Sequence, residues 1–354
     1  MALCFSLCMK TFPLLSPKIS FPFPLTPPYR KGAPFHGKLE PKALREWQEY
    51  EEAVKRKDLA RALRFLKSVE EKKANNNPVE LSNSPSLTKS KQPRVPEFGL
   101  VDGSERDWEV LDTCLNADDL RLVASAYTFL KSRGFLPNFG KYSSIVMEGT
   151  RDVTPTVLKS STGLEVILAL AFMDSIFLGG VCLAQISSYW PPYKRRILVH
   201  EAGHLLVAYL MGCPIRGVIL DPIVAMQMGI EGQAGTQFWD EKMNEELAEG
   251  QLSGTAFDRY CMVLFAGIAA EALVYGEAEG GENDENLFRS ICLLLRPPLS
   301  VAQMSNQARW SVLQSYNLLK WHRHAHLAAV KALESGSSLS VVIKSIEIAM
   351  TSKI

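Results

Sequence analysis

The chain has 354 residues, of which 47% are hydrophobic and 22% are charged, and its formal net charge is +1. These values are ordinary for a globular protein with a buried core, and the near-neutral charge argues against a nucleic-acid partner. The seven cysteines are scattered and form no Cys-x-x-Cys pair, so the sequence favours a thiol-tolerant compartment over a disulfide framework or a cysteine zinc site.

Residues 1–40 have the composition of a transit peptide. They contain Lys, Arg, Ser and Pro but no acidic residue before Glu40, which is typical of organelle-targeting segments. Lys10 and Pro13 interrupt the apolar run that a secretory signal would need, and the many prolines disfavour the amphipathic helix of a mitochondrial presequence. We therefore predict import into the chloroplast, with the mitochondrion as the alternative address. An untargeted, disordered tail is the simplest other interpretation.

Two helical stretches with a linker between them follow. Residues 41–74 form a charged segment in which leucines recur at the spacing of an amphipathic helix. Residues 75–97 are rich in Asn, Ser, Lys and Pro, a composition that predicts a disordered linker. Residues 98–160 form a small helical region, with a helical pattern from Asp107 to Arg133. The helical stretches are interpreted either as an adaptor unit or as a solvated hairpin without a specific partner.

Residues 163–186 are the most apolar part of the sequence. The run from Val166 to Ala184 is about long enough to cross a bilayer, and aromatic and basic residues follow it from Trp190 onward. Asp174 in the middle of the run would cost on the order of 3 kcal/mol on insertion, so a buried helix is the alternative. We predict a transmembrane or membrane-associated helix, with the thylakoid membrane as its expected place.

The sequence His-Glu-Ala-Gly-His at 200–204 lies in a helix-compatible apolar stretch from Arg195 to Leu210. In a helix, His200 and His204 share a face, so both imidazoles can point at one ion. Zinc binds neutral imidazole nitrogen and, in catalytic sites, keeps one position for water. Glu201 lies about 100° round the helix, off the ligand face but within reach of that water. The pattern predicts a catalytic zinc site with Glu201 as general base; two ordinary core histidines are the alternative.

A short strand is predicted from Arg216 to Leu220. It is interpreted either as a core strand or as an edge strand close to the zinc, where an extended substrate could pair with it.

The third zinc ligand is expected farther along the chain. Asp284 follows a Gly-rich turn, and it is either the N-cap of a helix running to Leu294 or a zinc ligand held at the start of that helix. Glu271, in a helical stretch from Phe265 to Leu273, is either a helix-surface acid or an acceptor that orients a zinc-bound imidazole.

A second histidine pair at helical spacing occurs at His322 and His326. Arg323 follows the first histidine, and a metal ion beside a cation is electrostatically unfavourable. We therefore predict a solvent-exposed helix face at this position.

Residues 195–350 resemble the peptidase domain of FtsH-type zinc metalloproteases. The resemblance rests on His-Glu-Ala-Gly-His-Leu-Leu-Val-Ala-Tyr-Leu, Ala-Gly-Ile-Ala-Ala-Glu and Gly-Gly-Glu-Asn-Asp, together with the stretch from Leu318 to Glu334. It implies a mostly α fold, in which a helical zinc-metallopeptidase domain with a small β element follows a helical N-terminal region.

The resemblance also implies the roles of five residues. A Zn²⁺ ion would be held by His200, His204 and Asp284, Glu201 would be the catalytic base, and Glu271 would orient a ligand from outside the ligand set.

Two departures from the family pattern matter. The Arg and the second acid of the family's Gly-Gly-Arg-x-Ala-Glu-Glu are missing from Ala266–Ala272. The Gly-Lys pairs at 37–38 and 140–141 lack the Ser or Thr of a phosphate loop, so we expect this chain to bind no ATP. In this respect the sequence resembles plant plastid FtsH-like proteins that lack the AAA ATPase domain.

Three hypotheses for function follow. The first is a zinc metalloendopeptidase that acts on protein or peptide substrates without its own ATPase motor. The second is a non-catalytic assembly or regulatory partner of FtsH-type subunits in a plastid membrane protease complex. The third is a structural zinc protein with a closed, four-ligand site.

Overall fold

The computed structural model describes residues 41–75, 105–144, 151–164, 191–228, 234–249 and 254–352. Within these ranges the chain is mostly helical and has one two-stranded sheet, which confirms the predicted mostly α class. The transit peptide at 1–40, nearly all of the linker at 75–97 and nearly all of the apolar segment at 163–186 lie outside the described residues. These three assignments therefore stay predictions.

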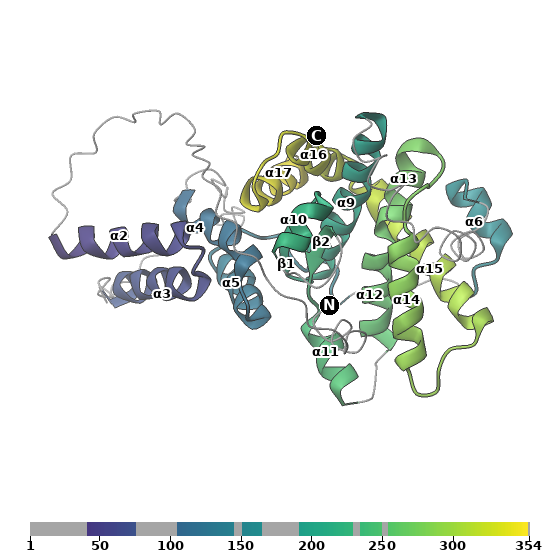
Figure 1. The fold of residues 1–354 in the computed structure, drawn as a ribbon, viewed down its shortest axis with the longest axis horizontal. Coiled ribbons are helices and arrows are strands. Elements are labelled where there is room, and N and C mark those ends of the chain that lie inside the picture. Colours follow the sequence, from purple (N-terminus) through teal and green to yellow (C-terminus); the bar gives the residue numbers. More distant parts are fainter. Residues whose placement is uncertain are drawn as a thin grey trace, which may run out of the picture.

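The N-terminal helices lie together at one end of the molecule (Figure 1). Helix α2 (Pro41–Lys55) pairs with α3 (Leu59–Asn75), and both contact the 3₁₀-helix η1 (Val110–Asn116). Leu63 and Leu66 of α3 are buried, as their helical spacing predicts.

The helical pattern from Asp107 to Arg133 is divided into three elements. Helix α4 (Glu105–Glu109) runs into η1, and α5 (Leu120–Ser132) begins separately. The division falls before Asp119, because its side chain accepts a hydrogen bond from the Arg121 backbone N–H at 2.9 Å and so starts a new helix. This region is tied to the sheet, since the Tyr127 hydroxyl donates to the carbonyl of Ile215 at 2.9 Å.

Helix α9 (Pro191–Met211), which carries the His-Glu-Ala-Gly-His motif, lies at the centre of the molecule (Figure 1). Leu205, Leu206 and Ala208 have no solvent exposure although they face different sides of the helix. A helix that is apolar all round has to be covered on every side. The neighbours that cover α9 are α12, α13, α15, α16 and both strands.

The sheet joins two strands that follow α9. Strand β1 (Ile215–Ile219) pairs with β2 (Gly235–Phe238) in antiparallel fashion, with Val218 opposite Thr236 and Ile219 opposite Gly235. Helix α10 (Pro222–Gln227) lies after β1, and α11 (Glu241–Ala248) comes after β2.

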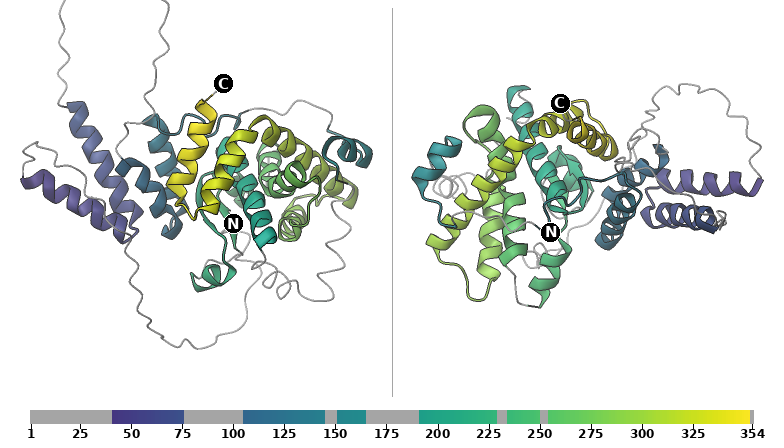
Figure 2. Two further views of the ribbon diagram at one scale, coloured as in Figure 1. Left: turned by 90° about the horizontal axis from the view of Figure 1, so that it is seen from above. Right: turned by 180° about the vertical axis from the view of Figure 1, so that it is seen from behind.

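The C-terminal helices pack around α9 on more than one side, and Figure 2 shows them from two further directions. Helix α17 (Leu339–Thr351) lies next to the N-terminal region, where it contacts η1. Short helix α6 (Pro155–Thr162) contacts α15 and α13 on the outside. The remaining helices are α12 (Gly254–Leu264), α13 (Ala266–Tyr275), α14 (Glu282–Leu294), α15 (Val301–Trp321), α16 (Arg323–Glu334) and α17 (Leu339–Thr351).

Gly203 allows α9 and α13 to approach closely. A Cβ atom at this position would lie 2.6 Å from the Ala266 carbonyl oxygen and 2.6 Å from the Ala270 Cβ, both on α13. Only glycine fits such a contact between two backbones. The close approach brings α13, and with it Glu271, beside the histidines of α9.

The prediction of a solvent-exposed histidine face in the C-terminal region is wrong for His326. Its ring is fully buried, and its Nε2 lies 3.0 Å from the Val199 carbonyl oxygen. The reason is that α16 packs directly on α9, so this face of α16 is an interior surface. His322 lies 2.8 Å from the Tyr142 hydroxyl through its Nε2.

Among the described residues, no helix combines the length and the apolar character that a membrane span requires.

Candidate metal centre

The two histidines of the motif lie side by side on α9. Their ring centroids are 4.7 Å apart, and both side chains are buried. One ligand atom from each of His200, Glu201 and His204 lies within 4.8 Å of the other two. The four-residue spacing therefore brings the imidazoles together on one helix face, as expected.

Each imidazole has its Nδ1 fixed by an acceptor. His200 Nδ1 lies 2.7 Å from Glu271 Oε1, and His204 Nδ1 lies 2.7 Å from the carbonyl oxygen of Val263. A carboxylate and a carbonyl can only accept, so each Nδ1 keeps its proton. The nitrogen that remains for a metal ion is Nε2 in both rings, which is the arrangement typical of metal-binding histidines.

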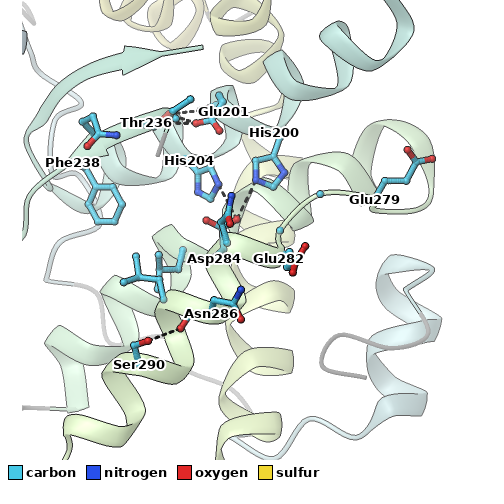
Figure 3. A pocket seen from close by; sticks show the side chains of 18 of the residues that line it. His200, Glu201, His204, Thr236, Phe238, Glu279, Glu282, Asp284, Asn286 and Ser290 are labelled. Atoms are coloured by element: carbon cyan, nitrogen blue, oxygen red, sulfur yellow. Dashed lines mark hydrogen bonds and ion pairs between the residues drawn. The ribbon is translucent and has the colours of Figure 1, made fainter. Parts of the chain in front are cut away.

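Asp284 meets both histidines from the opposite side of the cavity (Figure 3). Its Oδ2 lies 3.1 Å from His200 Nε2 and 3.4 Å from His204 Nε2. Two ligands bound tetrahedrally to zinc stand about 3.4 Å apart, because zinc–ligand distances are about 2.0–2.2 Å. The two distances from Asp284 Oδ2 to the histidines therefore match the separation of neighbouring ligands on one zinc ion.

Asp284 is not the N-cap of α14, so that alternative is wrong. The helix begins at Glu282, and the N-cap residue is Gly281, which has φ of 112° and offers no side chain. Asp284 lies in the first turn instead, three residues after the N-cap. Its side chain is consequently directed across to α9 and does not bond back to its own backbone.

The charges of the centre favour a cation between the two Nε2 atoms. Burial disfavours the charged imidazole, but hydrogen bonds to Asp284 and Glu271 outweigh it and hold the pKa of His200 well above its ordinary value. Burial likewise opposes ionisation of Asp284, but the two histidines hold the pKa of that carboxyl well below its ordinary value. A divalent ion bound to both Nε2 atoms would replace the Nε2 protons and would be attracted by the same carboxylates.

Gly267 of α13 makes room for the His200 ring. A Cβ atom at position 267 would lie 2.2 Å from His200 Nε2. Any side chain there would push the ring away from Asp284.

Glu201 is held by the first residues of β2. The backbone N–H of Thr236 donates to Glu201 Oε2 at 2.6 Å, and the Thr236 hydroxyl lies 2.8 Å from the same oxygen. A Cβ atom at Gly235 would lie 3.3 Å from Glu201 Oε1. The carboxylate is thus fixed beside the histidines but apart from the line that joins them to Asp284 (Figure 3).

The centre opens into a cavity of about 410 Å³. Strand β2 lines one wall along its whole length, and the turn before α14 lines another. Strand β1 does not contribute to the lining, so the strand beside the centre is β2 and not the segment Arg216–Leu220. Apolar side chains of Phe238, Leu264 and Leu287 lie at one side.

Comparisons with known proteins identify no relative of this chain. No protein-family model matches it, and neither the curated proteins nor the solved structures include a match.

Sequence reasoning did not find three residues that complete the centre. Val263 acts through its backbone carbonyl, which no residue type reveals, and Thr236 comes near Glu201 only through the sheet. Arg196 could have been found from the sequence, because it precedes His200 by one helical turn and therefore lies on the same helix face.

Proposed function

We propose that this protein is a zinc-dependent metalloendopeptidase of FtsH-like type. The observation that carries the proposal is the convergence of His200 Nε2, His204 Nε2 and Asp284 Oδ2, with Nδ1 of each ring already bound to an acceptor. Glu201 lies next to these three ligand atoms and is not one of them. Three protein ligands with an adjacent carboxylate are typical of catalytic zinc sites.

His200, His204 and Asp284 would hold the ion. Zinc bound there would act as a Lewis acid on a peptide carbonyl and lower the pKa of water toward about 7. Glu201 would take a proton from the attacking water and give it to the leaving amine. The N–H and the hydroxyl of Thr236 both donate to Glu201 Oε2, so Oε1 is the carboxylate oxygen that would carry out this proton transfer.

The cavity suits an extended peptide. Within the described residues the sheet has only two strands, so β2 is paired with β1 along one edge. Residues 235–238 of β2 line the cavity, and the Thr236 N–H points into it, to Glu201. A peptide chain lying along this edge would bring its carbonyl groups past the centre, while the Thr236 N–H stays bound to Glu201.

The proposal is tested with the full chain loaded with Zn²⁺ and a fluorescently labelled, unfolded casein. We expect the wild type to bind one zinc and cleave, and Glu201→Gln to bind zinc equally but lose cleavage by several orders of magnitude. Glu245→Gln on α11, outside the cavity, is the matched control and should cleave like the wild type. Cleavage by the Glu201→Gln protein would refute the mechanism. A wild type that binds zinc but cleaves no unfolded protein would favour the non-catalytic assembly partner.

A further inference from the structure

Arg196 is buried beside the metal centre although it does not touch any of the expected ligands. Its side chain is only 12% exposed and lies on α9, one turn before His200. The guanidinium donates through Nε to Glu271 Oε2 at 2.9 Å and forms an ion pair with Glu279. Its planar face lies 4.6 Å from the ring centre of Tyr275. The guanidinium nitrogens have separate partners, since Nη2 donates to the Glu277 carbonyl at 3.3 Å, and these contacts together with the stacking fix the side chain in one place.

Glu271 connects Arg196 to two parts of the centre at once. Its Oε1 accepts from His200 Nδ1 at 2.7 Å. The same carboxylate accepts from the backbone N–H groups of Glu279 and Gly280, at 2.9 and 3.2 Å. These N–H groups belong to the turn that leads into α14, the helix that carries Asp284.

We propose that Arg196 is a positioning residue of the metal centre. Through Glu271 it fixes the ring of His200 and the turn before Asp284. One guanidinium therefore keeps two of the three expected ligands, His200 and Asp284, in position relative to each other. Without it, Glu271 would be a buried carboxylate that lacks its Arg196 ion pair, and it would be held less firmly against the His200 ring. This inference rests on the metal centre of the proposed function, but it requires only binding of the ion.

Removal of Arg196 changes zinc affinity in opposite directions for two possible roles, so the direction of the change shows which role Arg196 has. If Arg196 acted only as a nearby positive charge, its removal would lessen repulsion of the ion and tighten zinc binding. If it positions Glu271, its removal must weaken zinc binding. Loss of a residue that orients a ligand typically lowers metal affinity by roughly 10- to 100-fold.

The test is a competition titration of the full chain with Zn²⁺ and a chelating dye, in wild type, Arg196→Ala and Arg196→Lys. We expect zinc affinity to fall in both variants, by roughly 10- to 100-fold in Arg196→Ala. The lysine keeps the charge but has no planar guanidinium to bond Glu271 and Glu279 together and stack on Tyr275, so it should also bind more weakly than the wild type. Arg195→Ala is the matched control: the neighbouring arginine pairs with Glu334 at 3.0 Å and is well exposed. This variant should bind zinc like the wild type.

A double mutant tests whether Arg196 acts through Glu271. In a Glu271→Gln background, the further change Arg196→Ala should cost much less affinity than it does in the wild type. Circular dichroism in the presence of a chelator checks that each variant is folded. If Arg196→Ala does not fold, the zinc affinity of Arg196→Lys is the deciding measurement.

Unchanged or tighter zinc binding in both Arg196→Ala and Arg196→Lys would overturn the inference. A wild type that binds no zinc would instead overturn the proposed function, so the two failures are distinguishable.

Discussion

The two histidines of the centre differ in what orients them, although the sequence presents them as equivalent. His200 is bound by the side chain of Glu271, and His204 by the backbone carbonyl of Val263. A side-chain partner can be removed by mutation, but a backbone partner cannot. We therefore expect variants around His200 to be the informative ones.

Gly267→Ala should abolish tight zinc binding. The added Cβ atom would lie 2.2 Å from His200 Nε2, so the ring has to leave its position opposite Asp284. We expect the affinity for Zn²⁺ to drop by roughly 10- to 100-fold, the range typical of losing a residue that orients a ligand. Dye competition measures it, with Gly254→Ala as the control because nothing lies within 4 Å of a Cβ atom there. Wild-type affinity in Gly267→Ala would show that the ring is not held as described.

Thr236→Val should lower kcat while leaving zinc content and KM nearly unchanged. The change removes the hydroxyl that lies 2.8 Å from Glu201 Oε2 but keeps the backbone N–H contact. A hydrogen bond to a charged group contributes about 1.5–3 kcal/mol, so a loss in kcat of roughly tenfold or more is expected. Steady-state kinetics on a casein-derived peptide measures it. Thr236→Ser, which retains the hydroxyl, should recover most of the rate; an equal defect in both variants would contradict the role of the hydroxyl.

At the scale of elements, the helix start of α14 determines whether Asp284 can reach the histidines. Asp284 lies in the first turn, and Asn283 precedes it about 100° round the helix. The side chain of Asn283 is exposed, and that of Asp284 lies close to both Nε2 atoms. The direction of the side chain round α14 therefore decides which of the two neighbours lies within reach of both histidines.

Exchanging these two neighbours should destroy the centre without changing composition or charge. In the double variant Asn283→Asp/Asp284→Asn, the carboxylate moves about 100° round α14, to an exposed position at the rim of the cavity. We expect zinc affinity to fall as far as in Asp284→Asn alone, and by more than the roughly 10- to 100-fold that loss of an orienting partner costs. Isothermal titration of all three proteins gives the comparison. If the exchanged protein binds zinc like the wild type, the carboxylate at 284 is not a ligand.

The sequence predicted the candidate site best where all the informative residues lie on a single helix. The helix around residues 200–204 could be predicted because its spacing, its apolar character and its chemistry agree. The approach of α13 could not, since it depends on Gly203 and Gly267 meeting other elements. The same reason explains the error at His326, where amphipathic spacing cannot show that α9 covers the face.

At the scale of the whole molecule, one hydrophobic core extends from the N-terminal helices to the C-terminal ones. The side chain of Glu347 on α17 lies fully buried where three segments meet. It accepts from the Asn138 backbone N–H at 3.0 Å and from the Tyr209 hydroxyl of α9. These contacts connect α17, α9 and the turn after α5, which no local pattern in the sequence could reveal.

Glu347 should make stability fall as pH rises. Burial raises the pKa of Glu347, and its hydrogen-bond donors only partly offset this. An acid with a raised pKa in the folded state stabilises the fold below its unfolded pKa, and this contribution is lost as pH rises through the folded value. Glu347→Gln does not ionise, so its Tm relative to the wild type should increase from pH 5 to pH 8. Thermal unfolding by circular dichroism measures this difference, and a constant difference across that range would contradict the assignment.

The central claim is that two histidines and a distant aspartate bind one zinc ion while Glu201 stays outside the ligand set. It is tested most directly by a crystal structure of the zinc-loaded protein, with anomalous scattering at the zinc edge to locate the ion. We expect a single ion about 2.0–2.2 Å from His200 Nε2, His204 Nε2 and an Asp284 oxygen, with its remaining position taken by no protein atom. An ion bound by Glu201 in a closed four-ligand site, or an ion away from Asp284, would contradict it.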